Sequence, residues 1–201
     1  MARRCLLFVL RWLQRVLFLG GVACVSWLYV SWKDATFYQL YARTQLAQIV
    51  RTVPAAVHPR LPASLRPNES IVGLFEVPRL DVSVVVAEGD DDAMLRVAVG
   101  HLPDTPFPWE EGNASMAGHR DTFFRALRNL QVGDDVRMVT THGTFDYRVS
   151  RMVIVGPQDV SVLHPDDATA LTLITCYPFT YLGDAPLRFI VQAERAPASE
   201  T

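Results

Sequence analysis

The sequence predicts a mainly β domain with short helices, a closed barrel or sandwich of about eight strands, preceded by a single N-terminal transmembrane helix. Three observations predict this architecture. Residues 16–32 contain no charged side chain, residues 53–70 hold four prolines, and short runs rich in β-branched and aromatic residues follow from residue 71 onward. At 201 residues the chain is long enough for one domain of ordinary size and a short appendage.

Residues 1–33 have the charge pattern of a membrane anchor. They carry five basic residues and no acidic one, and the uncharged run Val16–Trp32 is 17 residues long. That length is at the short end of what a helix needs to cross about 30 Å of hydrocarbon. Trp27 and Tyr29 lie toward its end, where interfacial aromatic residues are common. The positive flank comes first, so we expect a single pass through the cytoplasmic membrane, with the N-terminus inside and the body outside.

A cleaved signal peptide is the alternative interpretation of this segment. The apolar run continues through Trp27–Val30 and offers no convincing small-residue cleavage site. Gly21–Cys24 places small residues before a cysteine, as a lipoprotein signal does, but the expected leucine at the first position is missing. The sequence therefore favours an uncleaved anchor.

Residues 34–70 are predicted to form a helical stem followed by an extended linker. Side chains that can share one helical face recur every three or four residues, at Phe37, Leu40, Tyr41, Thr44 and Ala47. The prolines of 53–70 exclude a long helix there and favour an extended chain.

Residues 71–193 are predicted to form the β-rich body, with 194–201 as a tail. Ala93–Val99 has a brief helical pattern, and residues 141–143 are the tip of a predicted hairpin. The strand-like runs are Ile71–Val77, Asp81–Val86, Val136–Thr140, Thr144–Val149, Met152–Val155, Ala170–Thr175 and Leu187–Gln192.

The charge of the body argues against nucleic acid as a partner. The chain has 19 basic and 21 acidic residues, so without the five basic residues of 1–33 it has 14 against 21, a net of −7. Such a body repels phosphates. The acidic run Glu88–Asp92 lacks the spacing of an EF-hand loop and is interpreted as a solvated turn, and the histidines show no zinc-site spacing. We expect no metal and no cofactor.

Cys176 is the only cysteine of the predicted body, because Cys5 and Cys24 lie in or beside the anchor. Exported domains normally use cysteines in pairs, so a single one is either an inert core thiol or a reactive group. Cys176 ends a strand-like run and precedes a Tyr-Pro break, which places its sulfur at a strand mouth. A reactive thiol needs a base or a cation nearby. The residue types alone leave both interpretations open.

Two further residues have the chemistry that acyl transfer requires. His119 can give or take a proton near neutral pH, and Arg188 can donate hydrogen bonds to a carbonyl oxygen that becomes an oxyanion. Taken singly, each is more often a satisfied surface group, and spacing along the chain does not bring them together.

The motifs around these residues resemble the sortases. Thr172–Cys176 reads TLITC, which is similar to the TLxTC signature of that family, with His119 57 residues upstream and Arg188 12 residues downstream. The strings GHRDTFF from Gly118 and TCYPF from Thr175 resemble class D sortases in particular. The similarity covers about residues 71–193, and Asp104 departs from it, because relatives are expected to have glycine after Pro103.

The resemblance implies an eight-stranded sortase barrel in which His119, Cys176 and Arg188 are catalytic. It also implies a cysteine transpeptidase that cleaves an LPxTG-like sorting signal of secreted proteins through a thioacyl intermediate. The acceptor is an amine of a cell-wall peptide or a pilin lysine. We expect substrate-binding residues nearby, namely His101, Thr175, Tyr177 and Pro178. A cysteine endopeptidase that uses water as acceptor is the first alternative, and a non-enzymatic envelope binding module with an inert thiol is the second.

Overall fold

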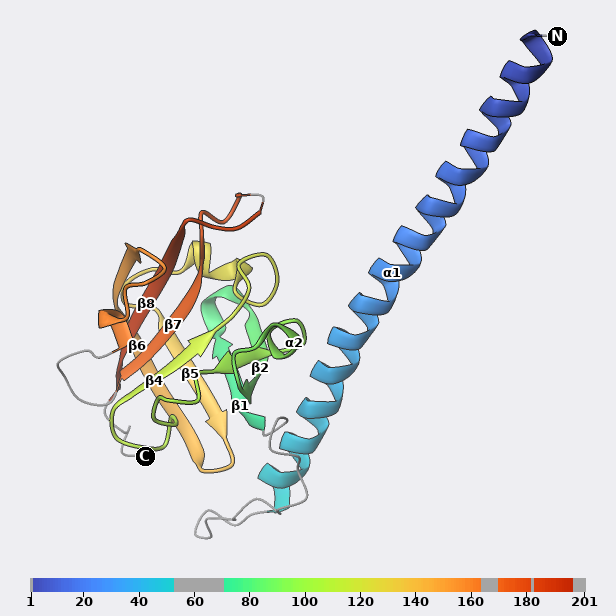
Figure 1. Cartoon of the computed structure of the whole chain (residues 1–201). Helices are drawn as coiled ribbons and strands as arrows, with labels where there is room; N and C mark the ends of the chain where they lie inside the picture. Colours follow the sequence, from blue (N-terminus) through green and yellow to red (C-terminus); the bar gives the residue numbers. More distant parts are fainter. Residues whose placement is uncertain (1, 53–70, 164–169, 182, 197–201) are drawn as a thin grey trace. The chain divides into compact units, whose positions relative to one another are not determined.

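A computed structural model describes residues 2–52, 71–163, 170–181 and 183–196 of the chain (Figure 1). The prolines of the predicted linker lie outside these residues. The chain forms two compact units, Met1–Phe37 and Tyr38–Thr201.

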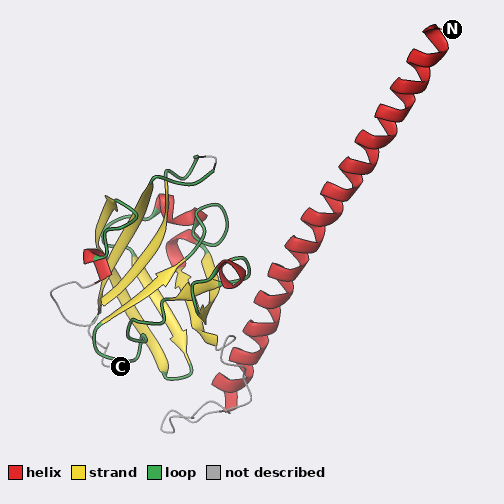
Figure 2. Ribbon diagram, viewed as in Figure 1, coloured by secondary structure: helices red, strands yellow, loops and turns green. Residues whose placement is uncertain are grey.

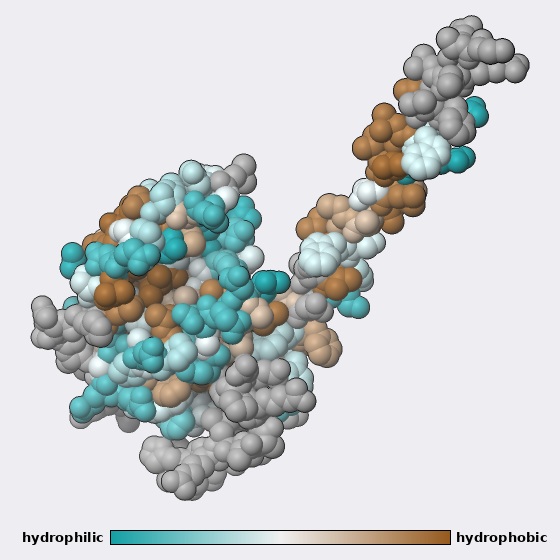
Figure 3. Space-filling view, viewed as in Figure 1, coloured by the Kyte–Doolittle hydropathy of each residue, from teal (hydrophilic) through white to brown (hydrophobic). Residues whose placement is uncertain are grey.

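Helix α1 (Ala2–Thr52) is continuous and includes the predicted stem helix. Its part Leu10–Ala47 is long and apolar enough to cross a membrane, judged by length and composition. Large apolar side chains such as Phe18 and Trp27 are 69% and 73% exposed, and apolar residues follow the helix in Figure 3. Exposure on that scale is unfavourable in water and is consistent with a membrane-spanning helix.

The body of the chain is a closed barrel of eight strands in the order β1-β2-β3-β4-β7-β8-β6-β5 among the described residues (Figure 2). Two neighbouring pairs, β2 with β3 and β4 with β7, are parallel, and the other neighbours are antiparallel. The predicted closed barrel is thereby confirmed. The strands are β1 (Ile71–Val77), β2 (Val82–Glu88), β3 (Val99–His101), β4 (Asn113–Ala117), β5 (Asp135–Thr140), β6 (Gly143–Val155), β7 (Ala170–Tyr177) and β8 (Leu187–Arg195).

Short helices fill the connections of the barrel, as expected. Asp91 begins α2 by accepting hydrogen bonds from the backbone N–H groups of Ala93 and Met94 through its side chain. The connecting helices are α2 (Asp92–Leu95) and the 3-10 turns η2 (Pro78–Leu80), η3 (Arg125–Asn129) and η4 (Ser161–Leu163).

Several boundaries differ from the predicted ones. Strands β3 and β4 are not among the predicted runs, and the helical pattern over Ala93–Val99 gives only the single turn α2. Strand β6 runs through the whole of Gly143–Val155, with a bulge between Val149 and Arg151 that lets the predicted hairpin strand and its extension pair with β8 as one strand. Strand β8 continues to Arg195, two residues into the predicted tail.

One apolar core fills the barrel. Alternate residues of β4, β7 and β8, such as Met116, Leu173 and Val191, are fully buried in it. Phe75 of β1 meets Phe124, which follows β4, edge to face at 5.7 Å between ring centroids. The core therefore supports the three strands that bear the candidate residues.

The C-terminal end of α1 completes the barrel where β3 is too short. Strand β3 pairs with β2 only from Val86 onward. The carboxamide of Gln39 accepts a hydrogen bond from Val85 N at 3.0 Å and donates one to Val97 O at 2.8 Å. Ala42 is buried beside this contact. The helix thus satisfies main-chain groups that a longer strand would otherwise pair.

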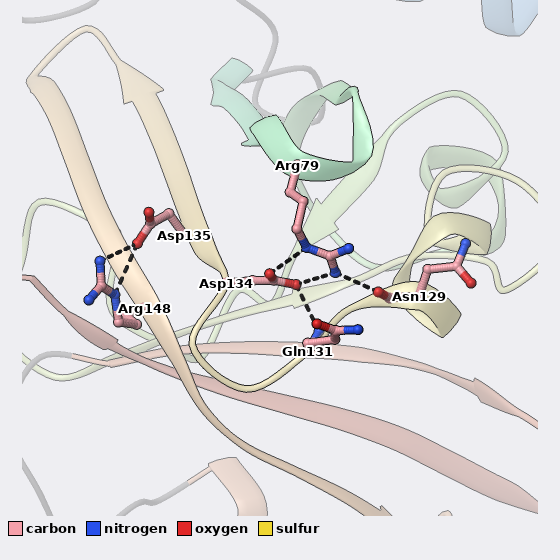
Figure 4. A network of polar contacts seen from close by, with 6 residues as sticks. All are labelled: Arg79, Asn129, Gln131, Asp134, Asp135 and Arg148. Atoms are coloured by element: carbon pink, nitrogen blue, oxygen red, sulfur yellow. Dashed lines mark hydrogen bonds and ion pairs between the residues drawn. The ribbon is translucent and has the colours of Figure 1, made fainter.

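A buried carboxylate ties η2 to the start of β5 (Figure 4). Asp134 accepts hydrogen bonds from Arg79 at 2.5 and 2.6 Å and from Gln131 N at 2.7 Å. The hydrogen bonds from Arg79 hold the pKa of the Asp134 carboxyl below its ordinary value of 3.8, against the opposing effect of burial. The neighbouring Asp135 pairs with Arg148 on the surface, where both side chains are about two-thirds exposed.

Asp134→Asn is expected to destabilise the barrel, whereas Asp135→Asn is a matched control at the adjacent position. Loss of the charged acceptor should cost about 1 to 2 kcal/mol, a value reduced by the partial exposure of Arg79. The exposed pair of Asp135 should contribute less than about 1 kcal/mol. Urea unfolding of both variants at pH 7 measures the difference.

The effect should depend on pH with a definite sign. Because the folded-state pKa of Asp134 is lowered, its contribution is complete above 3.8 and disappears as the pH falls through the folded-state value. The gap between wild type and Asp134→Asn should therefore close in acid. Equal stability losses for the two substitutions at pH 7 would contradict the role given to Asp134.

Candidate active site

Strands β4, β7 and β8 bring three candidate residues to one side of the barrel. Cys176 lies opposite Arg188 in the antiparallel pair of β7 and β8. Residues directly opposite in such a pair project their side chains to the same face. The parallel pairing of β4 with β7 ends with Ala117 opposite Ile174, and His119 and Cys176 each follow that pair by two residues. The pairing therefore gathers residues that are far apart in the sequence.

The side chain of Cys176 points away from the barrel interior. Leu173 belongs to the core, and the alternation of a strand places Thr175 on the same inner face and Cys176 on the opposite one. Cys176, His119 and Arg188 are each half-buried. A peptide can therefore reach this site from the outer face of the barrel.

Thr175 and Gly118 fix the segment that carries His119. The Thr175 hydroxyl donates a hydrogen bond to Gly118 O at 2.6 Å, and Gly118 N donates one to Ile174 O of β7 at 3.1 Å. A Cβ at Gly118 would lie 2.8 Å from the ring of Phe124, so only glycine fits this close approach. Thr175, which precedes Cys176, thus holds Gly118, which precedes His119.

Thr175 is predicted from the sequence to bind substrate, and in the structure its side chain has another partner. Its side chain is 2% exposed and its hydroxyl is already engaged. The cause is the two-residue period of β7, which turns Thr175 inward when Cys176 turns outward. We therefore treat Thr175 as a residue that positions its neighbours.

Arg188 is the second residue of β8, and part of its guanidinium is hydrogen-bonded to the backbone just before it. Its Nη1 donates to Ala185 O at 3.2 Å and to Leu187 O at 3.1 Å. These are its hydrogen bonds within the described residues, where its Nε and Nη2 donors have no acceptor. A guanidinium in this state has donors to offer an incoming carbonyl.

Tyr177 ends β7 and Pro178 begins the connection to β8, and both are half-buried. The Tyr177 ring lies 6.1 Å from Phe179 and 6.4 Å from Phe189, and those two rings meet edge to face at 5.4 Å. Phe179 and Phe189 also pack against the core. The aromatic cluster therefore anchors the first residues after Cys176. Their contact with substrate remains a prediction.

Arg120 is a site residue that the sequence does not single out. Its Nη2 donates to Tyr181 O at 2.7 Å and to Gly183 O at 2.8 Å, and its guanidinium lies 6.0 Å from the Tyr181 ring centroid. It thereby joins the segment after His119 to the connection between β7 and β8. Its place directly after His119 in the GHRDTFF string is the signal that marks it.

Comparison with known proteins decides the family. Residues 75–196 match the family model of the sortase domain, which is more than half of the chain. The chain belongs to the sortase family. Sortases are cysteine transpeptidases, so this sortase is an enzyme of that class, and the alternative of a non-enzymatic binding module is wrong.

Named relatives agree with the class suggested by the motifs. Sortase D of Bacillus subtilis strain 168 is 36% identical over 135 residues, which cover 66% of this chain and 68% of the relative. A sortase D5 transpeptidase of Clostridium perfringens has a structure that superposes with a TM-score of 0.64 at 25% identity, covering 82% of this chain and 99% of the other. Sortase E1 of Streptomyces coelicolor, solved with a tripeptide in its active site, gives a TM-score of 0.59 at 29% identity and covers 65% and 90%.

His101 of this sortase is predicted from the sequence to bind substrate, but its side chain is fully buried. Its Nδ1 lies 2.7 Å from Glu88 Oε2, its Nε2 lies 3.0 Å from Pro106 O, and its ring stacks on Phe107 at 4.6 Å. In this arrangement the imidazole holds the connection between β3 and β4. Its contact with substrate stays a prediction.

The acidic turn of this sortase is occupied with structural contacts. Glu88 pairs with His101, and Asp91 begins α2. Among the described residues, no three histidine, cysteine or acidic side chains are grouped in a way that holds a metal. The absence of a metal remains a prediction, and the interpretation as a turn gains a physical reason.

Proposed function

We propose that this sortase cleaves an LPxTG-like sorting signal of secreted proteins and transfers the acyl part to an amine of a cell-wall peptide or a pilin lysine. The proposal is supported by the strand register, which sets Cys176 opposite Arg188 and ends the pairing of β4 with β7 two residues before His119 and Cys176, and by the half-buried state of all three residues. The three supply a nucleophile, a proton donor and an oxyanion donor, the roles that acyl transfer needs.

Acylation uses all three residues. The Cys176 thiolate attacks the scissile carbonyl carbon, so that a carbon–sulfur bond forms and the carbonyl oxygen becomes an oxyanion. Arg188 donates hydrogen bonds to that oxyanion. When the tetrahedral intermediate collapses, the peptide C–N bond breaks. His119, as imidazolium, gives its proton to the departing amine, which leaves a thioester on Cys176.

In deacylation the proton moves in the opposite direction, from the acceptor amine to His119. The acceptor amine attacks the thioester carbon, a new C–N bond forms and the carbon–sulfur bond breaks. His119, now neutral, takes the proton that the amine loses, and the Cys176 thiolate is restored. Water can replace the amine in this step, which gives the endopeptidase reaction instead. The relative rates at which the amine and water attack the thioester decide the product.

We also propose that α1 anchors the enzyme in the cytoplasmic membrane with the N-terminus inside and the barrel outside. The uncharged run and its basic N-terminal flank support this orientation. A membrane-impermeant maleimide added to intact cells should label Cys176 in the membrane fraction. Recovery of a labelled enzyme that starts after Trp32 and is free in solution would contradict the anchor.

The experiment that tests the function incubates the detergent-extracted enzyme with a fluorescent LPxTG-type peptide, with and without an amine acceptor. Intact-protein mass spectrometry should find the mass of the acyl fragment added to the enzyme, and peptide mapping after digestion should place it on the peptide that contains Cys176. Added amine should convert the released acid into amide product. Cleavage without any acyl adduct on Cys176 would refute the mechanism, whereas acid product alone at saturating amine would favour the endopeptidase.

A further inference from the structure

We infer that Arg120 is a positioning residue that fastens the connection between β7 and β8 to the segment of His119, and so sets how His119, Cys176 and Arg188 face one another. The inference rests on the proposed function of this site. It assigns to Arg120 a part in the reaction without contact with the reacting atoms.

The position of Arg120 in the chain makes it a bridge. It directly follows His119, and its two acceptors, the carbonyls of Tyr181 and Gly183, lie in the connection between the strands that carry Cys176 and Arg188. One nitrogen thus holds two carbonyls that are two residues apart. Two charge-assisted hydrogen bonds from a single planar group fix both the place and the direction of the connection.

Few other contacts hold this part of the connection. Tyr181 N donates to Pro178 O at 3.3 Å, and Arg188 donates to Ala185 O, but both bonds stay within the connection itself. Among the hydrogen bonds of the described residues, those of Arg120 are the ones that reach it from the β4 side. Tyr181 is 47% exposed and buries little apolar surface. Among the described residues, the hydrogen bonds that remain without Arg120 are therefore those within the connection itself.

The arrangement of Arg120 is unfavourable in one respect. Its Nη1 is buried and has no hydrogen-bond partner among the described residues. A buried donor without an acceptor opposes folding, so stability alone does not explain an arginine here. A role in placing catalytic groups does explain it, because a small displacement of such groups lowers the rate strongly.

The test compares Arg120→Gln with Arg125→Gln, an exposed arginine five residues further on in η3. For cleavage of the sorting peptide, kcat of Arg120→Gln should fall about tenfold or more while KM changes less than about threefold. Arg120→Lys, which keeps the charge and a donor, should recover part of the loss. Arg125→Gln should behave as wild type. An unchanged kcat for Arg120→Gln, in a wild type that cleaves the peptide, overturns the inference.

Hydrogen exchange gives a second readout that needs no substrate. Backbone amides in the connection between β7 and β8 should exchange about tenfold faster in Arg120→Gln, with the strands unchanged. Faster exchange over the whole barrel, or none in the connection, would show a general structural role and overturn the inference. A wild type that cleaves no sorting peptide refutes the proposed function instead, and the exchange measurement still decides whether Arg120 holds the connection.

Discussion

Cys176→Ala is expected to lower cleavage of a sorting peptide by three or more orders of magnitude, to the level of the uncatalysed control. The proposed reaction has no other nucleophile, since Cys176 is the thiol that β7 carries to the outer face beside Arg188. The thiol is half-buried and alanine is smaller by one sulfur atom, so the thermal unfolding midpoint should change little.

Cys24→Ala is the matched control. Cys24 is a free cysteine that is exposed on α1, in the proposed membrane anchor. It should leave cleavage and acyl-adduct formation unchanged. Residual turnover of Cys176→Ala above background, or loss of turnover in Cys24→Ala, would remove Cys176 from the centre of the mechanism.

Arg188→Lys should slow acylation by the sorting peptide on the order of 10²–10³-fold although the charge is conserved. The guanidinium already uses Nη1 on the carbonyls of Ala185 and Leu187 and has further donors for an oxyanion. An ammonium has one nitrogen and different reach, so it cannot hold the connection and the oxyanion in the same geometry.

Two rates separate the oxyanion role of Arg188 from other roles. Alkylation of Cys176 by iodoacetamide creates no oxyanion and should change much less than acylation. Arg195→Lys, an exposed position on the same strand, should alter neither rate. Equal falls of both rates in Arg188→Lys would mean that Arg188 sustains the thiolate or the fold, and the oxyanion role would be withdrawn.

The strands that the sequence predicts are those with a period of their own. Strands β1, β2, β5, β6, β7 and β8 contain enough alternating β-branched or aromatic residues to be recognised. Strand β3 has three residues, and β4 reads Asn-Ala-Ser-Met-Ala, in which no side chain is β-branched or aromatic. They are strands because they pair with their neighbours in the barrel, β3 with β2 and β4 with β7. Pairing between segments far apart in the chain leaves no pattern in the local sequence.

The same distinction applies to the site. The order and spacing of His119, Cys176 and Arg188 can be recognised by resemblance, because motifs are local. The bridge made by Arg120 joins residues about sixty positions apart, and burial of His101 depends on the fold around Glu88. Neither is visible in a linear pattern. The inward turn of Thr175 follows from strand alternation once Cys176 is placed outward.

The closed barrel has a consequence for how a sorting signal is read. Many proteins capture extended peptides by adding them as a strand to a free sheet edge, where main-chain groups bind almost any sequence. Among the described residues all eight strands close into the barrel, and Gln39 bonds Val85 N of β2 and Val97 O just before β3. Among the described strands, none is left as a free edge for β-augmentation. We therefore expect selectivity for a sorting signal to reside in side chains and connections rather than in main-chain pairing.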